Sequence, residues 1–479
     1  MMGNSSNEQF NALQCIVGFF LESKGTPEGV IEMLAHMGVS VSTQTTRNMV
    51  NSLTKNARER SKTLPPTMFI YDNFDMDFKV AQPTVGKSGS HASMTSATFA
   101  PYAAMGSSDN LRFTQELHKT SRFNKDLAAG DPRIYTPRIR DILPRQFPAV
   151  EGLDPLSRAF AWHLRAILVQ QEPSFAAYTS QLGAPEAVDV LPVTRTIQFP
   201  ASAINADEGQ SDGNWQVLVN MLEQSGVPDA RLEEDVILVH GDLSTKERID
   251  SLRKMRTIEH SSKNRLDFVV FVPGLFHLKM AATDAFWRAH IQPREGREDP
   301  TGFMEYIRHL RPRETGRFTS TPGFRRLHDS IHHATWVDVL DCWRLEALSL
   351  GHRNLEMFFA AQPSWELISK MSKTMVQKYL PGRNFGDIRQ GDDANRDICF
   401  ENTAVRKQHG LLYLELSHSM NYGDVGRILR LFPYWIALFK STGKHKYTAH
   451  MIRFLTDLDN VYPPKLRYVT IISHRDMPR

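Results

Sequence analysis

Cysteine is scarce in this sequence. The three cysteines among its 479 residues, Cys15, Cys342 and Cys399, lie far apart, and no C-x-x-C pair occurs. A zinc ribbon needs such pairs, and a small disulfide scaffold is much richer in cysteine. The scarcity therefore excludes a zinc ribbon, argues against a disulfide scaffold and predicts a protein of a reducing compartment.

Long apolar runs are missing as well. A membrane-spanning helix requires about 18 or more consecutive apolar residues, and the sequence contains no such run. The opening "MMGNSSNEQFNALQ" has no basic start followed by an apolar core, which argues against a secretory signal. We therefore expect no membrane contact and an intracellular location, with the nucleus among the candidates.

An excess of one charge is also missing. The 57 lysines and arginines nearly balance the 53 aspartates and glutamates, for a net charge of +4. Any contact with nucleic acid must therefore come from local basic patches. No P-loop, G-x-G-x-x-G or G-x-S-x-G pattern occurs, so nothing supports an NTPase, a dinucleotide-binding enzyme or a serine hydrolase.

Residues 26–58 have the pattern of two helices joined by a turn. Thr26 and Pro27 predict the start of the first helix, and Gly38 is typical of a helix end. The second helix is expected to begin near Thr43 and to bury an apolar stripe of Met49, Val50 and Leu53. The pattern predicts a helix-turn-helix segment.

The other faces of that second helix carry residue types that read bases and phosphates. These are Arg47, Asn48, Asn51 and Lys55. We expect this side of the helix to be exposed and to bind DNA. The alternative is an ordinary helical hairpin with a solvated polar face.

Buried strands alternate with helices in the segments that follow. We expect five strands in one mixed sheet, near residues 67–72, 93–99, 193–199, 235–241 and 267–272. The 67–72 and 235–241 strands should lie side by side. This order of elements resembles a ribonuclease H-like core, the fold of many transposases and integrases.

The expected organisation follows from these patterns. An N-terminal helical domain covers residues 1–63, and an α/β core covers 64–290 with an insertion at about 104–190. Residues 291–400 form a helical insertion, and the helices of 401–479 complete the core.

Three acids stand out because they follow or interrupt apolar segments. Asp72 follows "MFIY", Asp242 follows "VILVHG", and Glu415 lies within "LLYLEL". Buried carboxylates are costly unless they are paired or bind a metal. Together these three would suit Mg²⁺ or Mn²⁺ in phosphodiester chemistry, whereas each strand-end acid alone is typical of a turn or a helix cap.

A histidine cluster offers a second metal hypothesis. His328 and His332 stand four residues apart on a predicted helix, with His333 beside them. This spacing can place two imidazoles on one zinc ion. No third ligand is evident nearby, so a hydrogen-bonded or solvated helix face is the simpler interpretation.

Five blocks of the chain resemble a fungal family known as domain of unknown function 6589. They are "MFIYDNFDMDFKVAQPTVGK", "GDLSTKERIDSLRKMR", "VPGLFHLKMAATDAFWRAH", "LLYLELSHSMNYGDVGRIL" and "KSTGKHKYTAHMIRFL". The resemblance runs from about residue 25 to the C-terminus. It implies a core similar to those of cut-and-paste transposases.

The resemblance also implies roles for particular residues. Asp72 in "YDN", Asp242 in "GDL" and Glu415 in "LYLEL" would be catalytic ligands of Mg²⁺ or Mn²⁺. His277 in "LFH" would orient or neutralise the phosphate. Removing any of the three acids is expected to leave the metal-free protein at least as stable, because their mutual repulsion is relieved.

Two further features bear on this resemblance. Asp424 and Arg427 fall in the recurring block "GDVGR" and are secondary candidates. Leu243 stands where related sequences often have glutamine, and relatives continue beyond the final "PPKLRYVTIISHRDMPR". The alternative function is therefore an inactive, domesticated or truncated descendant that binds DNA or protein.

Overall fold

The computed structural model describes residues 11–78, 90–102, 108–144, 148–192, 197–382, 385–390 and 396–474. The chain divides into two compact units, each discontinuous in sequence. The sheet unit comprises residues 1–115, 197–240 and 247–270. The helical unit comprises residues 116–196, 241–246 and 271–479.

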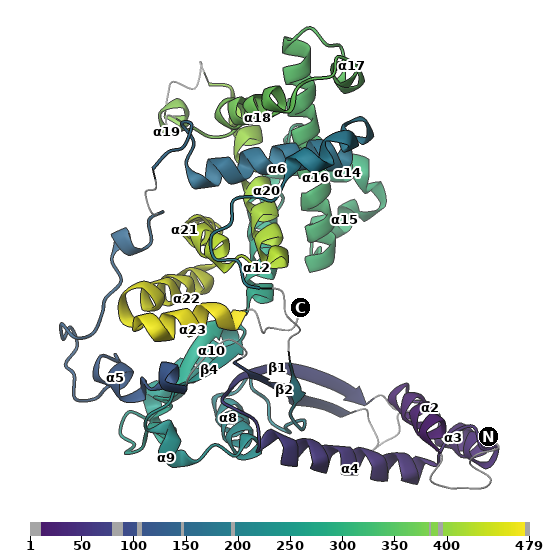
Figure 1. Cartoon of the computed structure of the whole chain (residues 1–479), viewed down its shortest axis with the longest axis vertical. Helices are drawn as coiled ribbons and strands as arrows, with labels where there is room; N and C mark the ends of the chain where they lie inside the picture. The colour runs from purple at the N-terminus through teal and green to yellow at the C-terminus, as the bar shows by residue number, and fades with distance from the viewer. Residues whose placement is uncertain are drawn as a thin grey trace. The chain divides into compact units, whose positions relative to one another are not determined.

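A five-stranded mixed sheet has the strand order β3-β2-β1-β4-β5. The strands are β1 Thr67–Phe78, β2 Ser90–Pro101, β3 Phe199–Pro200, β4 Ile237–Gly241 and β5 Val269–Pro273. β1 is antiparallel to β2, and Figure 1 shows the two side by side. β1 is parallel to β4, with Phe69 opposite Val239 and Ile70 opposite His240.

The sequence-based expectation of one mixed sheet with the first and fourth strands adjacent is confirmed. The expected strand at 193–199 is reduced to two residues of β3, and residues 193–196 lie outside the described residues. All five residues of β4 are buried, because an apolar run in a central strand packs on both faces of the sheet. Tyr71 of β1 donates its hydroxyl hydrogen to Asn214 of α8 (Ser211–Ser225) at 3.1 Å, which fixes this helix on the sheet.

Three helices, α2 Ala12–Ser23, α3 Glu28–His36 and α4 Thr43–Ser61, precede the sheet. Gly38 ends the turn of α3 with a φ of +72°, as the sequence predicts. Pro27 is the N-cap of α3, one residue later than the expected cap at Thr26. Ser42 caps α4 by accepting a hydrogen bond from the Thr45 N–H at 3.2 Å.

The predicted apolar stripe of α4 is wrong. Val50 and Leu53 are 39% and 56% exposed. The helix is anchored near its two ends instead: Thr43 donates to Glu32 of α3 at 2.6 Å, and Ser61 donates to the Gln224 carbonyl of α8 at 2.6 Å. The middle of a 19-residue helix held in this way extends into solvent.

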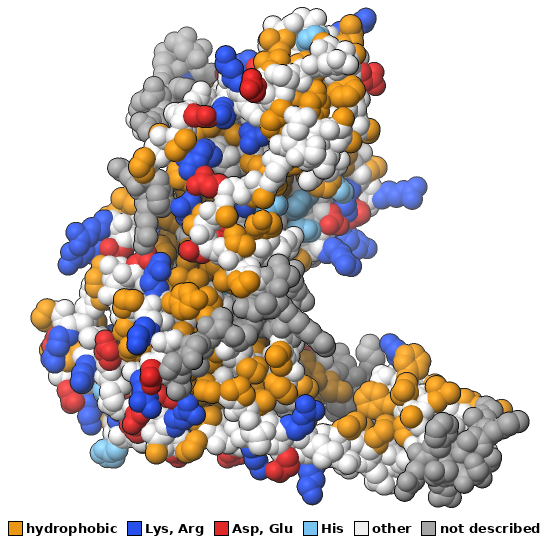
Figure 2. Space-filling view, viewed as in Figure 1, with side chains coloured by type: hydrophobic (Ala, Val, Ile, Leu, Met, Phe, Trp, Pro, Cys, Tyr) orange, Lys and Arg blue, Asp and Glu red, His pale blue; other side chains and the backbone are white. Residues whose placement is uncertain are grey.

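The neighbouring helix α2 also leaves apolar side chains exposed. Leu13, Ile16 and Phe20 are 66%, 67% and 56% exposed. Their spacing of three and four residues places them on one helix face, and Figure 2 shows hydrophobic side chains gathered over this segment.

Short elements complete the sheet unit and its connections. They are η1 Ser108–Leu111, α5 Thr114–Lys119, α9 Asp229–Leu232, α10 Leu243–Met255 and α11 Ser262–Arg265.

The helical unit is built around four long helices, α6 Pro155–Gln171, α16 Phe324–Ser349, α18 Trp365–Tyr379 and α20 Ile398–Tyr422. α6 crosses α16 and α20 in Figure 1, and the three pack against one another. Trp343 of α16 is fully buried and donates its indole N–H to the Leu164 carbonyl of α6 at 3.0 Å. Burial of such large aromatic side chains supplies much of the core.

The other helices of this unit surround that core. The longer ones are α12 Leu275–His290, α14 Phe303–Leu310, α21 Val425–Ser441, α22 His445–Thr456 and α23 Pro464–Ser473. The short ones are η2 Ile139–Asp141, η3 Pro173–Tyr178, α7 Thr179–Leu182, α13 Arg294–Glu298, η4 Pro312–Glu314, α15 Thr315–Phe318, α17 Leu355–Ala360, α19 Phe385–Arg389 and η6 Asp457–Val461.

Over the described residues, no helix is both long and apolar enough to span a membrane. Cys15, Cys342 and Cys399 are all free thiols.

Candidate functional sites

Asp72 lies inside a strand rather than at its end. β1 continues to Phe78, whereas the pairing with β4 covers only Phe69 and Ile70 of β1. The Asp72 side chain is exposed, and its Oδ1 accepts a hydrogen bond from the Asn73 N–H at 2.9 Å. The sequence-based expectation that Asp72 ends the strand is therefore wrong, although Asp72 does lie beyond the residues that pair with β4.

Asp242 directly follows β4 and caps helix α10. Its Oδ1 accepts hydrogen bonds from the Thr245 N–H at 2.7 Å and from the Thr245 hydroxyl at 3.0 Å. Both bonds end on the same oxygen of a half-buried carboxylate. The capping role that the sequence left open is thus present, and it uses one of the two oxygens.

His277 lies in the first turn of α12, just after β5. The Gly274 N–H donates to the Gly241 carbonyl at 3.0 Å, so the starts of α10 and α12 lie side by side. The backbone carbonyl of His277 accepts a hydrogen bond from the Tyr447 hydroxyl of α22 at 3.5 Å.

Tyr447, which bonds the His277 backbone, also responds to the charge of Asp242. Burial, together with the negative charges of Asp242 and Asp284, raises the pKa of Tyr447 to about 12. A raised pKa keeps the Tyr447 hydroxyl protonated, so that it can donate to the His277 backbone. Sequence reasoning missed Tyr447, because nothing in "KSTGKHKYTAH" indicates that its tyrosine faces the end of a strand.

Glu415 lies in a buried ion-pair network of the helical unit. Its side chain is 3% exposed, and Arg427 donates to it through Nε at 2.8 Å and Nη2 at 2.5 Å. His163 Nε2 lies 2.7 Å from Oε2, and the Ser419 hydroxyl donates to Oε1 at 3.2 Å. Protein donors therefore occupy both carboxylate oxygens.

The network controls the charge of Glu415. Burial by itself raises the pKa of this carboxyl, but the hydrogen bonds and charges of His163 and Arg427 outweigh burial and lower the pKa to about 2. Glu415 is thus a carboxylate balanced by a guanidinium. In the part of the chain that the structure describes, no group of three His, Cys, Asp or Glu side chains is arranged to hold a metal ion.

The "GDVGR" block has a structural role. Asp424 is fully buried and accepts backbone N–H bonds from Val188 at 2.9 Å, Asp189 at 3.0 Å and Arg427 at 3.0 Å. A side chain at Gly426 would approach Val188 and Asp189 to 2.5–2.8 Å, so only glycine fits. The block fastens the 188–189 segment against the start of α21 and presents Arg427 to Glu415.

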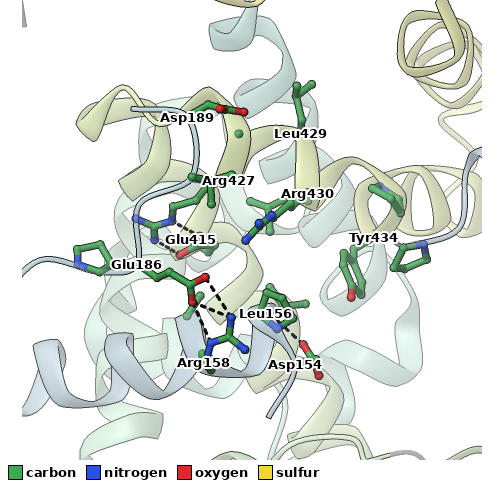
Figure 3. Close-up of a pocket in the computed structure, with 18 of the residues that line it drawn as sticks. Asp154, Leu156, Arg158, Glu186, Asp189, Glu415, Arg427, Leu429, Arg430 and Tyr434 are labelled. Atoms are coloured by element: carbon green, nitrogen blue, oxygen red, sulfur yellow. Dashed lines mark hydrogen bonds and ion pairs between the residues drawn. The ribbon is translucent and has the colours of Figure 1, made fainter. Parts of the chain in front are cut away.

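A cavity of about 890 Å³ lies beside this network. Its walls come from α6, α21 and the segment that ends at Asp189. Figure 3 shows the Arg427–Glu415 pair on one side, and a second pair, Arg158 and Glu186, on another. Its volume suits a small ligand, and sequence reasoning did not predict it.

The predicted DNA-reading residues are exposed on α4, as expected. Arg47, Asn48, Asn51 and Lys55 all face solvent. Arg47 lies 3.6 Å from Glu22, and Asn48 accepts a hydrogen bond from Gln44 at 3.0 Å. Neither contact buries the residue, so this side of α4 is accessible, and DNA binding stays a prediction.

The histidine cluster on α16 fits the hydrogen-bonded interpretation. His328 Nδ1 lies 2.7 Å from the Tyr413 hydroxyl of α20. Burial lowers the pKa of His332 to about 3, with a smaller effect from His328. Burial also lowers the pKa of His328, whereas His333 is exposed.

Comparison with known proteins identifies a family and nothing finer. A family model described as a family of unknown function, DUF6589, matches residues 138–473. The match starts well after residue 25, where the resemblance was expected to begin, so the block around Asp72 lies outside it. No curated protein and no solved structure matches the chain.

Proposed function

The chain belongs to the DUF6589 family, whose description assigns no activity, and we propose that it is a transposase-like nuclease with a ribonuclease H-like core. The activity would be Mg²⁺- or Mn²⁺-dependent phosphodiester cleavage or strand transfer on DNA, in an intracellular, nuclear setting. One observation carries the proposal. β1 stands in the middle of the sheet between antiparallel β2 and parallel β4, with an acid after the paired residues of both parallel strands.

The register of the parallel pair supports this choice of acids. Asp72 comes two residues after Ile70, and Asp242 comes two residues after its partner His240. Parallel strands run in the same direction, and ligands of α/β sheets bind beyond the carboxyl ends of such strands. We therefore assign Asp72 and Asp242 as the metal-binding acids.

The chemistry of these residues fits a hard cation. Carboxylate oxygens are the ligands that Mg²⁺ prefers, and the cap of α10 uses only Oδ1 of Asp242. When bound, the metal would activate the attacking oxygen and stabilise the leaving oxygen of an in-line displacement at phosphorus. His277, whose backbone is held by Tyr447, would orient the phosphate.

Glu415 receives a different role in this proposal. Arg427 and His163 already satisfy its carboxylate, so it stabilises the helical unit and is not needed as a ligand. Among the described residues, no other side chain is assigned as the third metal ligand that the sequence predicts.

That gap favours a second candidate function, a non-catalytic descendant that binds DNA or protein. Its supporting observation is that Asp242 already serves as a helix cap while Glu415 is neutralised. The accessible side of α4, with Arg47 and Lys55, would then be the contact surface.

Plasmid cleavage by the full chain with Mg²⁺ or Mn²⁺ separates the two. The variants Asp72→Asn and Asp242→Asn should abolish cleavage, whereas asparagine at 242 keeps the helix cap. Asp341→Asn is the matched control, because Asp341 is an exposed acid paired with Arg344. Cleavage by both asparagine variants at the parent rate would overturn the assignment of these two acids. Absence of cleavage by the parent with either metal would favour the binding module.

A further inference from the structure

The cavity of the helical unit has several arginines in its walls. At about 890 Å³ it falls within the range of roughly 300–1,000 Å³ that is typical of small-molecule sites. Five arginines line it: Arg158, Arg165, Arg427, Arg430 and Arg467. The cavity lies wholly within the helical unit and does not involve Asp72 or Asp242.

Carboxylate partners hold Arg158, Arg427 and Arg467. Arg158 lies 2.8 Å from Glu186, and Arg467 lies 3.5 Å from Asp459. Arg427 is held by Glu415. These three ion pairs form part of the cavity wall.

Arg165 is different. Its Nη1 donates to the neutral Ser372 hydroxyl at 2.7 Å, and its buried Nε has no hydrogen-bond partner among the described residues. An unsatisfied buried donor on a charged group is costly, and an acceptor supplied by a ligand removes that cost. A cationic donor without an acid therefore lines the cavity.

Arg430 and Tyr434 stand one turn apart on α21 and line the same cavity. Figure 3 shows Arg430 directed toward the Arg427–Glu415 pair, with Tyr434 farther along the helix. Trp162 and Leu156 of α6 add apolar surface. The cavity thus combines guanidinium groups with flat apolar walls.

Six acids also line the cavity: Asp141, Asp154, Glu186, Asp189, Glu415 and Asp459. Glu415 and Asp459 belong to the pairs above, and Asp154 and Glu186 also have protein partners. Asp154 caps α6 by accepting N–H bonds from Leu156 at 2.9 Å and Ser157 at 3.0 Å. Glu186 is paired with Arg158. A cationic ligand would compete for these carboxylates, whereas an anion meets the open donors of Arg165.

We propose that this cavity binds a phosphate-bearing ligand of nucleotide size. Arginine suits phosphate because its planar donors match two phosphate oxygens at once. Tyr434, Trp162 and Leu156 would contact the base. The same chemistry could come from a free nucleotide or from one nucleotide of a single strand.

Calorimetric titration of the full chain distinguishes these sources. The probes are ATP, inorganic phosphate and a short single-stranded DNA. Arg165→Gln and Arg430→Gln should each weaken binding of the preferred probe by about tenfold or more, which corresponds to loss of one charged hydrogen bond. Arg344→Gln removes a half-exposed arginine of α16 and is the matched control.

Each outcome of the titration supports or overturns the proposal. Binding of ATP alone assigns a free nucleotide, and binding of the oligonucleotide alone assigns a strand. Binding of both supports the shared chemistry. The proposal is overturned if the parent binds no probe or binds inorganic phosphate as tightly as ATP, or if Arg344→Gln weakens binding as much as the cavity variants. Thermal unfolding checks each fold, and Arg430→Gln decides alone if Arg165→Gln does not fold.

Discussion

Two groups of carboxylates in this protein have different kinds of hydrogen-bond and charge partners. In the helical core, Glu415 is matched with Arg427, and Asp338 is matched with Arg406 at 2.5 Å. Asp242, which follows β4, is held by the neutral Thr245, and Asp72, which lies within β1, is exposed. The first group has its charge balanced by protein cations, whereas the cap that Asp242 forms rests on a neutral residue.

This difference bears on which acids can be inferred from sequence to be metal ligands. A buried acid within an apolar sequence is typical of a metal site, but it is equally typical of a buried ion pair whose cation lies elsewhere in the chain. The sequence pattern identifies the buried acid but does not identify the distant cation that pairs with it. Three predictions test whether the two groups differ in this way, and a fourth tests the exposed side of α4.

The largest effect should come from breaking the buried pair. Glu415→Ala leaves the Arg427 guanidinium buried without its anion, which should lower the free energy of unfolding by about 3–5 kcal/mol. This reverses the sequence-based expectation that the metal-free protein would be at least as stable. Urea unfolding measures it. The exposed Asp341→Ala is the control, and equal losses in the two variants would contradict the assignment.

A related prediction concerns acid. The folded pKa of Glu415, about 2, lies below its ordinary value of 4.5, so its stabilisation is complete above pH 4.5 and is lost as the pH falls toward 2. The shift corresponds to about 3 kcal/mol. Unfolding of the parent should therefore show a stability loss across this window that Glu415→Gln lacks. Parallel pH profiles for the two proteins would refute the shifted pKa.

Patterns confined to neighbouring residues were predictable. β1, β4 and β5 follow from apolar runs, and the turn at Gly38 follows from a glycine that can adopt positive φ. The adjacency of β1 and β4 followed from the order of elements, and the structure adds that the two strands are parallel.

Contacts between distant segments were not predictable. His163 and Arg427 lie 252 and 12 residues from Glu415, and no local pattern links all three. The stripe of α4 failed for a similar reason, because apolar spacing indicates a face without showing that another element covers it. Leu53 faces solvent although its spacing is that of a buried residue.

A smaller effect should follow at Asp242. Asp242→Ala removes the cap of α10 and should lower the free energy of unfolding by about 1 kcal/mol, whereas Asp242→Asn should keep it, since asparagine caps equally well. Chemical denaturation of both variants measures this. A loss for asparagine as large as for alanine would mean that the charge, and not the hydrogen bond to Thr245, stabilises the helix.

The smallest stability effect should come from the exposed side of α4. Arg47→Gln and Lys55→Gln should each change the free energy of unfolding by no more than about 0.5 kcal/mol, because both side chains face solvent. If this side contacts phosphates, each variant should weaken duplex DNA binding and reduce the slope of log affinity against log salt by about 1. Arg344→Gln on the helical unit serves as the control. Fluorescence anisotropy at several salt concentrations measures the slope. An unchanged slope in both α4 variants would leave this helix an exposed but inert surface, and would place any DNA contact on other residues.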